Sequence, residues 1–188
     1  MANKRRKTLN GLAGQLAVMS ELAWRGYNVA IPEADFGTDV FVVSGESGGV
    51  QRVQVKTSDW YDRASGFWSK FTIGADKLDT SDTVHSEQEI YFILVTRTPS
   101  NGWHFIAMSC DDIRNDIKKL NAASLPENPA AKPLEYRINV GFIADKDSGL
   151  LRTVKSFGKS IAEPFDFTGI LDKWQYWDNM YQSQVSTP

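Results

Sequence analysis

Two short apolar runs separated by a glycine-rich turn constrain the fold of this chain more than any other feature. Asp39–Val43 is rich in β-branched and aromatic residues, and Val50–Thr57 alternates apolar and polar residues. A period of two is typical of a strand with one buried face. Because the intervening residues 44–49 (SGESGG) favour a chain reversal, the two runs predict a β-hairpin. The second strand then has an apolar face and a polar face, which carry Val53 and Val55, and Arg52, Gln54 and Lys56, respectively.

An amphipathic helix is expected before the hairpin. Apolar residues recur with a period near 3.6 from Leu9 to Arg25, which predicts about four helical turns. We expect Asn10 to cap the beginning of this helix and Gly26 to end it. Tyr27–Ile31 then has the composition of a short strand.

Further strands are expected downstream of the hairpin. Phe67–Ile73 predicts one strand, and Glu89–Thr96 predicts an interior one because it is rich in β-branched and aromatic residues. A turn then leads to Trp103–Met108, which we expect to pair with Glu89–Thr96. A helix is expected to follow, capped by Ser109 or Asp111 and running to about Leu120.

The last third of the chain has a different composition. Ala122–Pro133 is rich in proline and alanine and favours a linker or surface loop, and Glu135–Ile143 predicts a strand. Aromatic residues at helical spacing in Gly169–Gln182 predict a helix that packs on the core. The expected organisation is a basic N-terminal segment, a core, and a C-terminal extension packed on that core, with the boundaries 1–10, 11–123 and 124–188.

Four sequence blocks in the first third carry a resemblance to a known superfamily. They are residues 14–22 (GQLAVMSEL), 25–27 (RGY), 38–40 (TDV) and 53–58 (VQVKTS). In this order they resemble the core of the PD-(D/E)xK nuclease superfamily, which includes Holliday-junction resolvases, Mrr-type restriction enzymes and intron-associated endonucleases. The resemblance covers about Gly11 to Ile113. It implies an α/β fold with a restriction-endonuclease-like core, in which helices flank a mixed central β-sheet, followed by the C-terminal extension.

The resemblance also implies a metal-dependent hydrolysis of phosphodiester bonds in DNA. Such a reaction needs a hard cation with oxygen ligands and a group that manages the proton of the attacking water. By resemblance, Asp39 is the carboxylate ligand of Mg²⁺ or Mn²⁺, and Gln54 occupies the second metal position in a QxK variant of the motif. Lys56 would orient or deprotonate the water, and the carbonyl of Val55 would be a further ligand.

Two positions depart from the usual pattern of the superfamily. Gln54 replaces an acid, and Gln15 stands where many relatives have a glutamate on the first helix. Glu21 is the other candidate for that role, but six residues of helix place it about 120° away from Gln15. These departures leave open an alternative, in which the chain is a catalytically inactive module with the nuclease fold that binds nucleic acid or a protein partner.

Charge and composition restrict the partners. A chain of 188 residues with a formal net charge of −2 does not have the basic character of proteins that coat nucleic acid non-specifically. DNA is nevertheless the expected partner, and Trp60 belongs to an aromatic segment that would either stack on bases or form a lid or dimer contact. The candidate nucleic-acid contacts are Lys4, Arg5, Arg6, Lys7, Arg52, Ser58 and Trp60.

The remaining expectations concern location and assembly. A lone cysteine, Cys110, cannot form an intramolecular disulfide, and the sequence has no run of 18 apolar residues, so we expect a cytoplasmic protein without a membrane partner. His104 lies in a predicted strand between aromatic residues, which favours a structural role. A homodimer is expected because related nucleases often cut both strands as dimers, and a protein partner would bind through the C-terminal region.

Overall fold

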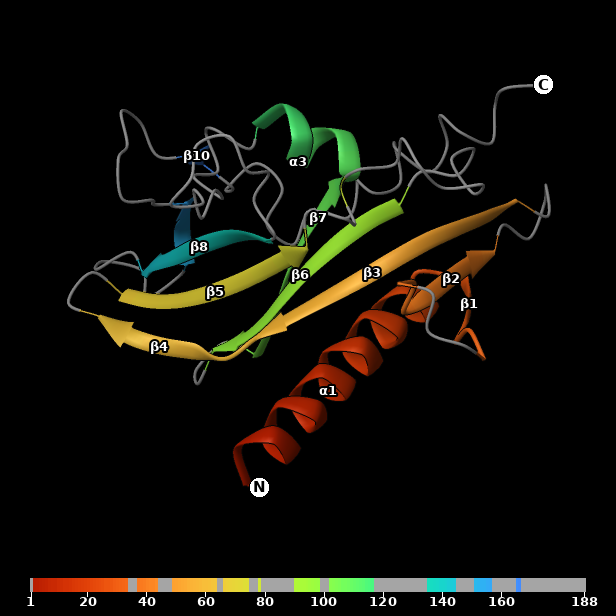
Figure 1. Cartoon of the computed structure of the whole chain (residues 1–188), viewed down its shortest axis with the longest axis horizontal. Coiled ribbons are helices and arrows are strands. Elements are labelled where there is room, and N and C mark those ends of the chain that lie inside the picture. Colours follow the sequence, from red (N-terminus) through yellow and green to blue (C-terminus); the bar gives the residue numbers. More distant parts are fainter. Residues whose placement is uncertain are drawn as a thin grey trace.

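Two β-sheets form the framework of the molecule (Figure 1). The computed structural model describes residues 2–33, 37–43, 49–63, 66–74, 78, 90–98, 102–116, 135–144, 151–156 and 165–166. Within these residues each sheet has five strands. The fold class is therefore α/β with a mixed central sheet flanked by helices, as expected from the sequence.

The first sheet contains the predicted hairpin. Its order is β1-β2-β3-β6-β7, with the bounds Asn28–Ala30, Val40–Val43, Val50–Ser58, Ile90–Thr98 and Gly102–Ser109. The pair β3–β6 is parallel, whereas the other neighbouring pairs are antiparallel. The two predicted hairpins, β2–β3 and β6–β7, are thus confirmed, and β6 is an interior strand.

The second sheet combines strands from both ends of the chain. Its order is β10-β9-β8-β5-β4, with the bounds Phe165–Asp166, Leu151–Ser156, Glu135–Ala144, Gly66–Gly74 and Trp60–Arg63. Each neighbouring pair in it is antiparallel. The strands expected at Phe67–Ile73 and Glu135–Ile143 are confirmed, and they pair with each other. The chain after the proline-rich segment therefore extends a sheet that β4 and β5 begin.

Helix α1 (Ala2–Trp24) covers one face of the first sheet (Figure 1). It begins before the expected position, so the prediction that Asn10 caps it is wrong: lysine and arginine are good helix formers, and they continue the helix toward the N-terminus. Its end is as predicted. Gly26 has a φ of 92°, and the N–H groups of Gly26 and Tyr27 donate to the carbonyls of Ala23 and Leu22 at 3.0 Å. This is a Schellman motif, which satisfies the last carbonyls of a helix.

Helix α3 (Cys110–Asp116) lies on the other side of the first sheet in this view (Figure 1). Ser109 is its cap, because the Asp112 amide donates to Ser109 Oγ at 2.9 Å and the Ser109 amide donates to Asp112 Oδ2 at 3.0 Å.

Three other expectations from the sequence concern His104, the last third of the chain and membrane spans. His104 is buried, and its Nε2 lies 3.1 Å from Thr98 Oγ1, in keeping with a structural role. The segments Ala122–Pro133 and Gly169–Gln182 lie outside the described residues. No helix in the described part of the chain has the length and apolar character needed to cross a bilayer.

The contact between α1 and β3 is tight. Val18 and Leu22 of α1 are fully buried and share a core cluster with Val53 and Val55 of β3, so the apolar face predicted for this strand is the one that meets the helix. The approach is closest at Gly14, where a Cβ atom would stand 1.9 Å from Thr57 Oγ1. A glycine is therefore required for the helix to lie this close to the strand.

Gly14→Ala is expected to lower the free energy of unfolding by about 1–3 kcal/mol, because the new methyl group overlaps Thr57. Gly11→Ala is the matched control. A Cβ at Gly11 has no neighbour within 4 Å, so this variant is expected to be neutral or to gain up to about 1 kcal/mol of helix propensity. Urea unfolding of both variants measures the difference, and equal free energies for the two would contradict the tight contact.

Candidate functional site

The candidate site lies where β2 begins. β2 pairs with residues Val50–Val53 of β3, and the Asp39 amide donates to the Val53 carbonyl at 2.9 Å. β3 continues for five residues beyond Val53. The start of β2 therefore places the Asp39 side chain beside the edge of β3 at the QVK triplet.

The side chain of Asp39 is held by that triplet. Asp39 Oδ2 accepts a hydrogen bond from the Val55 amide at 2.7 Å and another from Gln54 Nε2. Gln54 is buried, with 6% of its surface exposed, whereas Asp39 is half-buried. The carboxylate thus contacts two of the positions that the resemblance assigned to the metal site.

Of the two candidates on α1, Gln15 is the one that contacts Asp39. Gln15 Nε2 donates to the Asp39 carbonyl oxygen at 2.6 Å. Glu21 instead forms an ion pair with Arg25, one helical turn further on, with 2.9 Å between Glu21 Oε1 and the guanidinium. The side chain that α1 presents to Asp39 is therefore a neutral amide.

Lys56 lies on the same face of β3 as Gln54. Strand periodicity places Gln54, Lys56 and Ser58 on this face, opposite the valines that meet α1. The second sheet packs on this face as well, because Ser69 of β5 lies 2.7 Å from the Thr96 hydroxyl and Thr96 donates to the Ser58 carbonyl at 3.1 Å. Lys56 itself is half-buried.

The candidate nucleic-acid contacts do not form one cluster. Lys4, Arg5, Arg6 and Lys7 lie in the first turns of α1, where the side chains of Arg6 and Lys7 are exposed and those of Lys4 and Arg5 lie outside the described residues. Arg52 donates to Thr38 Oγ1 at 3.0 Å, next to Asp39. Ser58 connects the two sheets, because its hydroxyl accepts from the Lys70 amide at 3.0 Å. Trp60 lines a cavity.

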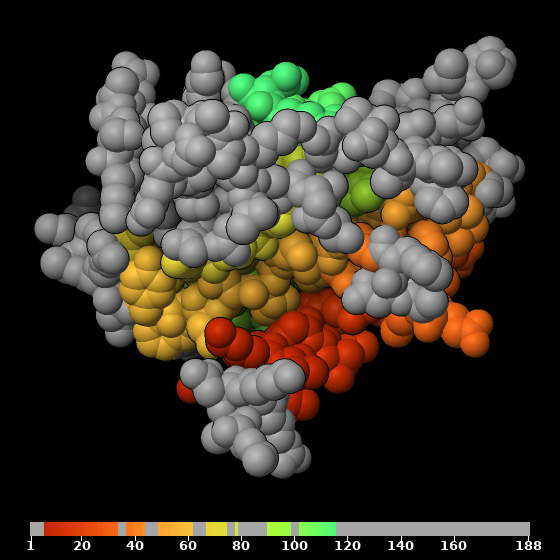
Figure 2. Space-filling view, in the orientation of Figure 1, coloured from red at the N-terminus to blue at the C-terminus, as the bar shows by residue number. Residues whose placement is uncertain are grey.

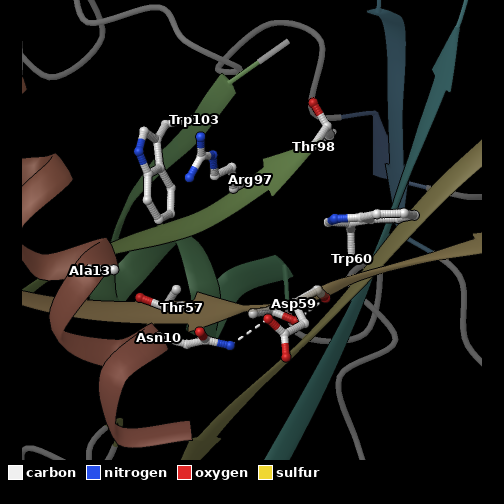
Figure 3. A pocket seen from close by; sticks show the side chains of 9 residues that line it. Asn10, Ala13, Thr57, Asp59, Trp60, Arg97, Thr98 and Trp103 are labelled. Carbon is white, nitrogen blue, oxygen red and sulfur yellow. Dashed lines mark hydrogen bonds between the residues drawn. The ribbon is translucent and has the colours of Figure 1, made fainter. Parts of the chain in front are cut away.

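This cavity was not foreseen from the sequence. It has a volume of about 460 Å³ and lies between the first half of α1, the β3–β4 junction and the adjoining ends of β6 and β7 (Figure 3). Asn10, Arg97 and Trp103 line it together with Trp60, and they come from four separate elements. No local pattern in the sequence connects these residues, because only the tertiary fold brings them together.

The oxygen atoms at Asp39 define which metal could bind there. Among the described residues, no three His, Cys, Asp or Glu side chains gather into a metal-binding group. Asp39 carries one carboxylate, to which Gln54 presents its Nε2 and Val55 its backbone amide. The oxygens that these two residues could add are the Gln54 amide oxygen and the Val55 carbonyl. Such a set does not make a dedicated cage. Mg²⁺ is the cation whose sites commonly keep several waters and use one or two carboxylates together with substrate phosphates.

Comparison with known proteins bears on the fold. No protein-family model matches the sequence, and no curated protein matches it either. Among solved structures, the chain is similar to a bacterial homing endonuclease, I-Ssp6803I, with a TM-score of 0.53 and 14% sequence identity. The match covers 96% of this chain and 98% of that one. At this identity the similarity shows a shared fold.

Asp39→Ala is expected to lower the free energy of unfolding by about 1–3 kcal/mol, because it leaves the Val55 amide and the buried Gln54 amide without their acceptor. Asp39→Asn keeps an oxygen in place and is expected to lose less. Urea unfolding compares the two variants with the parent protein. An alanine variant as stable as the parent would show that the hydrogen bonds to Asp39 do not support the fold.

Proposed function

We propose that this chain is a divalent-metal-dependent nuclease of the PD-(D/E)xK type that hydrolyses phosphodiester bonds in DNA. The observation that carries the proposal is the convergence on Asp39: Gln54 and Val55 from β3 and Gln15 from α1 all hydrogen-bond to it. Three separate sequence blocks of the superfamily pattern thus meet at one residue. The similarity to a homing endonuclease over almost the whole chain supports the same class.

In the proposed site, Asp39, the Gln54 amide oxygen and the Val55 carbonyl would hold Mg²⁺ or Mn²⁺. When bound, the cation would neutralise charge that develops on the phosphoryl oxygens. The Val55 amide and Gln54 fix the Asp39 carboxylate before substrate arrives. Gln15 anchors the backbone of the same residue, so the carboxylate is held in place from two elements.

Lys56 is the residue proposed to act on the attacking water. It follows Gln54 by two positions and therefore lies on the same face of β3. Lys56 is half-buried, and a charge beside protein groups interacts with a nearby phosphate more strongly than the same charge in bulk water. As an ammonium, Lys56 would orient the water and stabilise negative charge on the phosphorane; as a neutral amine, it would take the proton of the water and become that ammonium.

One observation favours a second candidate function, a non-catalytic module that binds nucleic acid or a protein partner. Asp39 Oδ2 already accepts two hydrogen bonds, and two of its three neighbours are neutral glutamines. The site is therefore satisfied without a cation. DNA binding without cleavage is the outcome that this candidate predicts.

Three further expectations stay predictions from the sequence. They are assembly as a homodimer, a protein partner for the C-terminal region and a cytoplasmic location.

The nuclease proposal is tested by incubating linear, supercoiled and branched DNA with the protein in Mg²⁺, Mn²⁺ or EDTA. The parent protein is expected to cut only with metal. Lys56→Ala is expected to lower the cleavage rate by about 10²- to 10⁴-fold, which is the range for loss of a general acid–base group. Asp39→Asn is expected to abolish metal-dependent cleavage, and gel analysis of the products measures all three.

Matched controls separate chemistry from general damage. Lys70→Ala removes an exposed lysine of β5, and Asp111→Asn removes an exposed acid of α3; both variants are expected to cut like the parent. If Lys56→Ala cuts as fast as Lys70→Ala, the role given to Lys56 is wrong. If folded parent protein binds these DNA molecules but never cuts them, the non-catalytic module replaces the nuclease.

Gln54→Glu tests the metal site independently of cleavage. Without metal, it places two carboxylates side by side and removes the Gln54 donor to Asp39, so the free energy of unfolding should fall by about 1–3 kcal/mol. Added Mn²⁺ should restore more stability to this variant than to the parent, because a second carboxylate binds a hard cation more strongly. Thermal unfolding with Mn²⁺ or EDTA measures this, with the double variant Asp39→Asn/Gln54→Glu as control. An unchanged response to Mn²⁺ in Gln54→Glu would exclude a cation at Asp39.

A further inference from the structure

The cavity beside Trp60 is lined by an aromatic ring, a guanidinium, an amide and a carboxylate. We propose that it binds one unpaired nucleotide of the DNA strand that enters the Asp39 site, with the base on Trp60 and the phosphate near Arg97. This assignment rests on the proposed function for the identity of the substrate. The volume of the cavity, about 460 Å³, falls in the range of small-molecule sites.

Trp60 offers a fixed surface for stacking. Its ring packs edge-to-face on Phe67, with 5.4 Å between ring centroids and 88° between ring planes. This contact leaves Trp60 half-buried and lining the cavity, and it holds the ring in place before a ligand binds (Figure 3). A pre-positioned aromatic ring stacks on a base with little loss of conformational entropy, and such stacking is tolerant of base identity.

Arg97 supplies positive charge on the opposite wall. It is exposed, and its guanidinium lies over the Trp103 ring at 5.7 Å from the centroid. This cation–π contact leaves the guanidinium N–H groups on an exposed side chain, and a guanidinium can bind a phosphate in bidentate fashion. Figure 3 shows Arg97 and Trp103 on one side of the cavity and Trp60 on the other.

The third wall carries hydrogen-bonding groups for the edge of a base. Asn10 Nδ2 donates to Asp59 Oδ1, and the side chains of both residues line the cavity. Arg6 lies 3.8 Å from Asp59 Oδ2; this exposed ion pair offsets part of the negative charge that Asp59 would present to a phosphate at Arg97. An amide and a carboxylate together offer both donors and acceptors to the Watson–Crick edge of a base.

The cavity is close enough to the Asp39 site for one strand to occupy both. Gln15 contacts Asp39 and Asn10 lines the cavity; five residues of helix separate them by a rise of roughly 8 Å along the axis and by about 140° around it. Along β3, Val55 contacts Asp39 and Ser58 lines the cavity, which is roughly 10 Å. Figure 2 shows the surface of α1 directly against that of β3 and β4. This spacing corresponds to about three nucleotides of a B-form strand and to fewer in a stretched one.

The geometry selects an unpaired nucleotide over a paired one. Within a duplex, the faces of a base are covered by its stacked neighbours and its Watson–Crick edge by its partner. Trp60 and the Asn10–Asp59 pair would use that face and that edge. A base must therefore leave the duplex, or come from a single-stranded segment, before it can enter the cavity.

Fluorescence anisotropy in EDTA tests the assignment without any cleavage. The probes are a fluorescein-labelled single-stranded 12-mer of DNA, the same 12-mer with abasic residues at its centre, and its matched duplex. The parent protein should bind the intact single strand more tightly than the abasic one. Trp60→Ala should weaken binding of the intact strand by about 5- to 100-fold, which is the range for one stacked base, and bring it to the level of the abasic probe.

Two further variants keep the test decisive. Arg97→Gln removes only an exposed charge, should fold normally, and should weaken binding of the intact and abasic strands alike, with a smaller dependence on salt. Tyr61→Ala, which removes the adjacent exposed aromatic residue of β4 outside the cavity, should bind like the parent. The assignment is overturned if Arg97→Gln and folded Trp60→Ala both bind like Tyr61→Ala. If the parent protein cleaves DNA but Arg97→Gln and Trp60→Ala bind it normally, only the proposed cavity site is refuted. If binding depends on Trp60 but the parent never cleaves DNA, only the proposed nuclease activity is refuted.

Discussion

The close packing of α1 on β3 is the contact on which the rest of the arrangement depends. Gly14 lets the helix backbone reach Thr57, while Val18 and Leu22 fill the space against Val53 and Val55. Once this contact fixes the rotation and position of α1, its other side chains have determined places. Gln15 reaches the Asp39 carbonyl, and Asn10 reaches Asp59. One glycine contact therefore sets the position of the helix at both the Asp39 site and the cavity.

Those parts of the structure that depend on local periodicity were predictable from the sequence. The β2–β3 hairpin follows from the alternation in β3 and its glycine-rich turn, and the polar face that carries Gln54 and Lys56 follows from the same alternation. The end of α1 follows from Gly26, whose positive φ suits the Schellman motif. The resemblance to the superfamily predicted Asp39 and Gln54 as residues of one site, and the two side chains are hydrogen-bonded in the structure.

Other features depend on contacts between distant residues and have no local signal. Asn10 looks like a helix cap in sequence, but its side chain bonds to Asp59, 49 residues away, and the helix continues past it. Glu21 and Gln15 were both candidates because a helical wheel alone cannot show which side of the helix faces Asp39. In the structure Glu21 forms an ion pair with Arg25, and Gln15 is the residue that contacts Asp39. The pairing of β5 with β8 joins segments more than 60 residues apart, and the cavity gathers four elements.

The neutral surroundings of Asp39 have a consequence for the proposed chemistry. With acids in place of Gln15 and Gln54, an empty site would hold like charges together and a cation would relieve their repulsion. Here the two N–H donors to Asp39 Oδ2 stabilise the carboxylate without a cation, so a metal gains less by binding. The missing negative charge would then come from the phosphates of the bound strand. Because coupling between two ligands is reciprocal, metal and DNA should each raise the affinity for the other. A strand held at Trp60 and Arg97 would thus recruit the cation at the scissile phosphate, which restricts cleavage to DNA that already occupies the cavity.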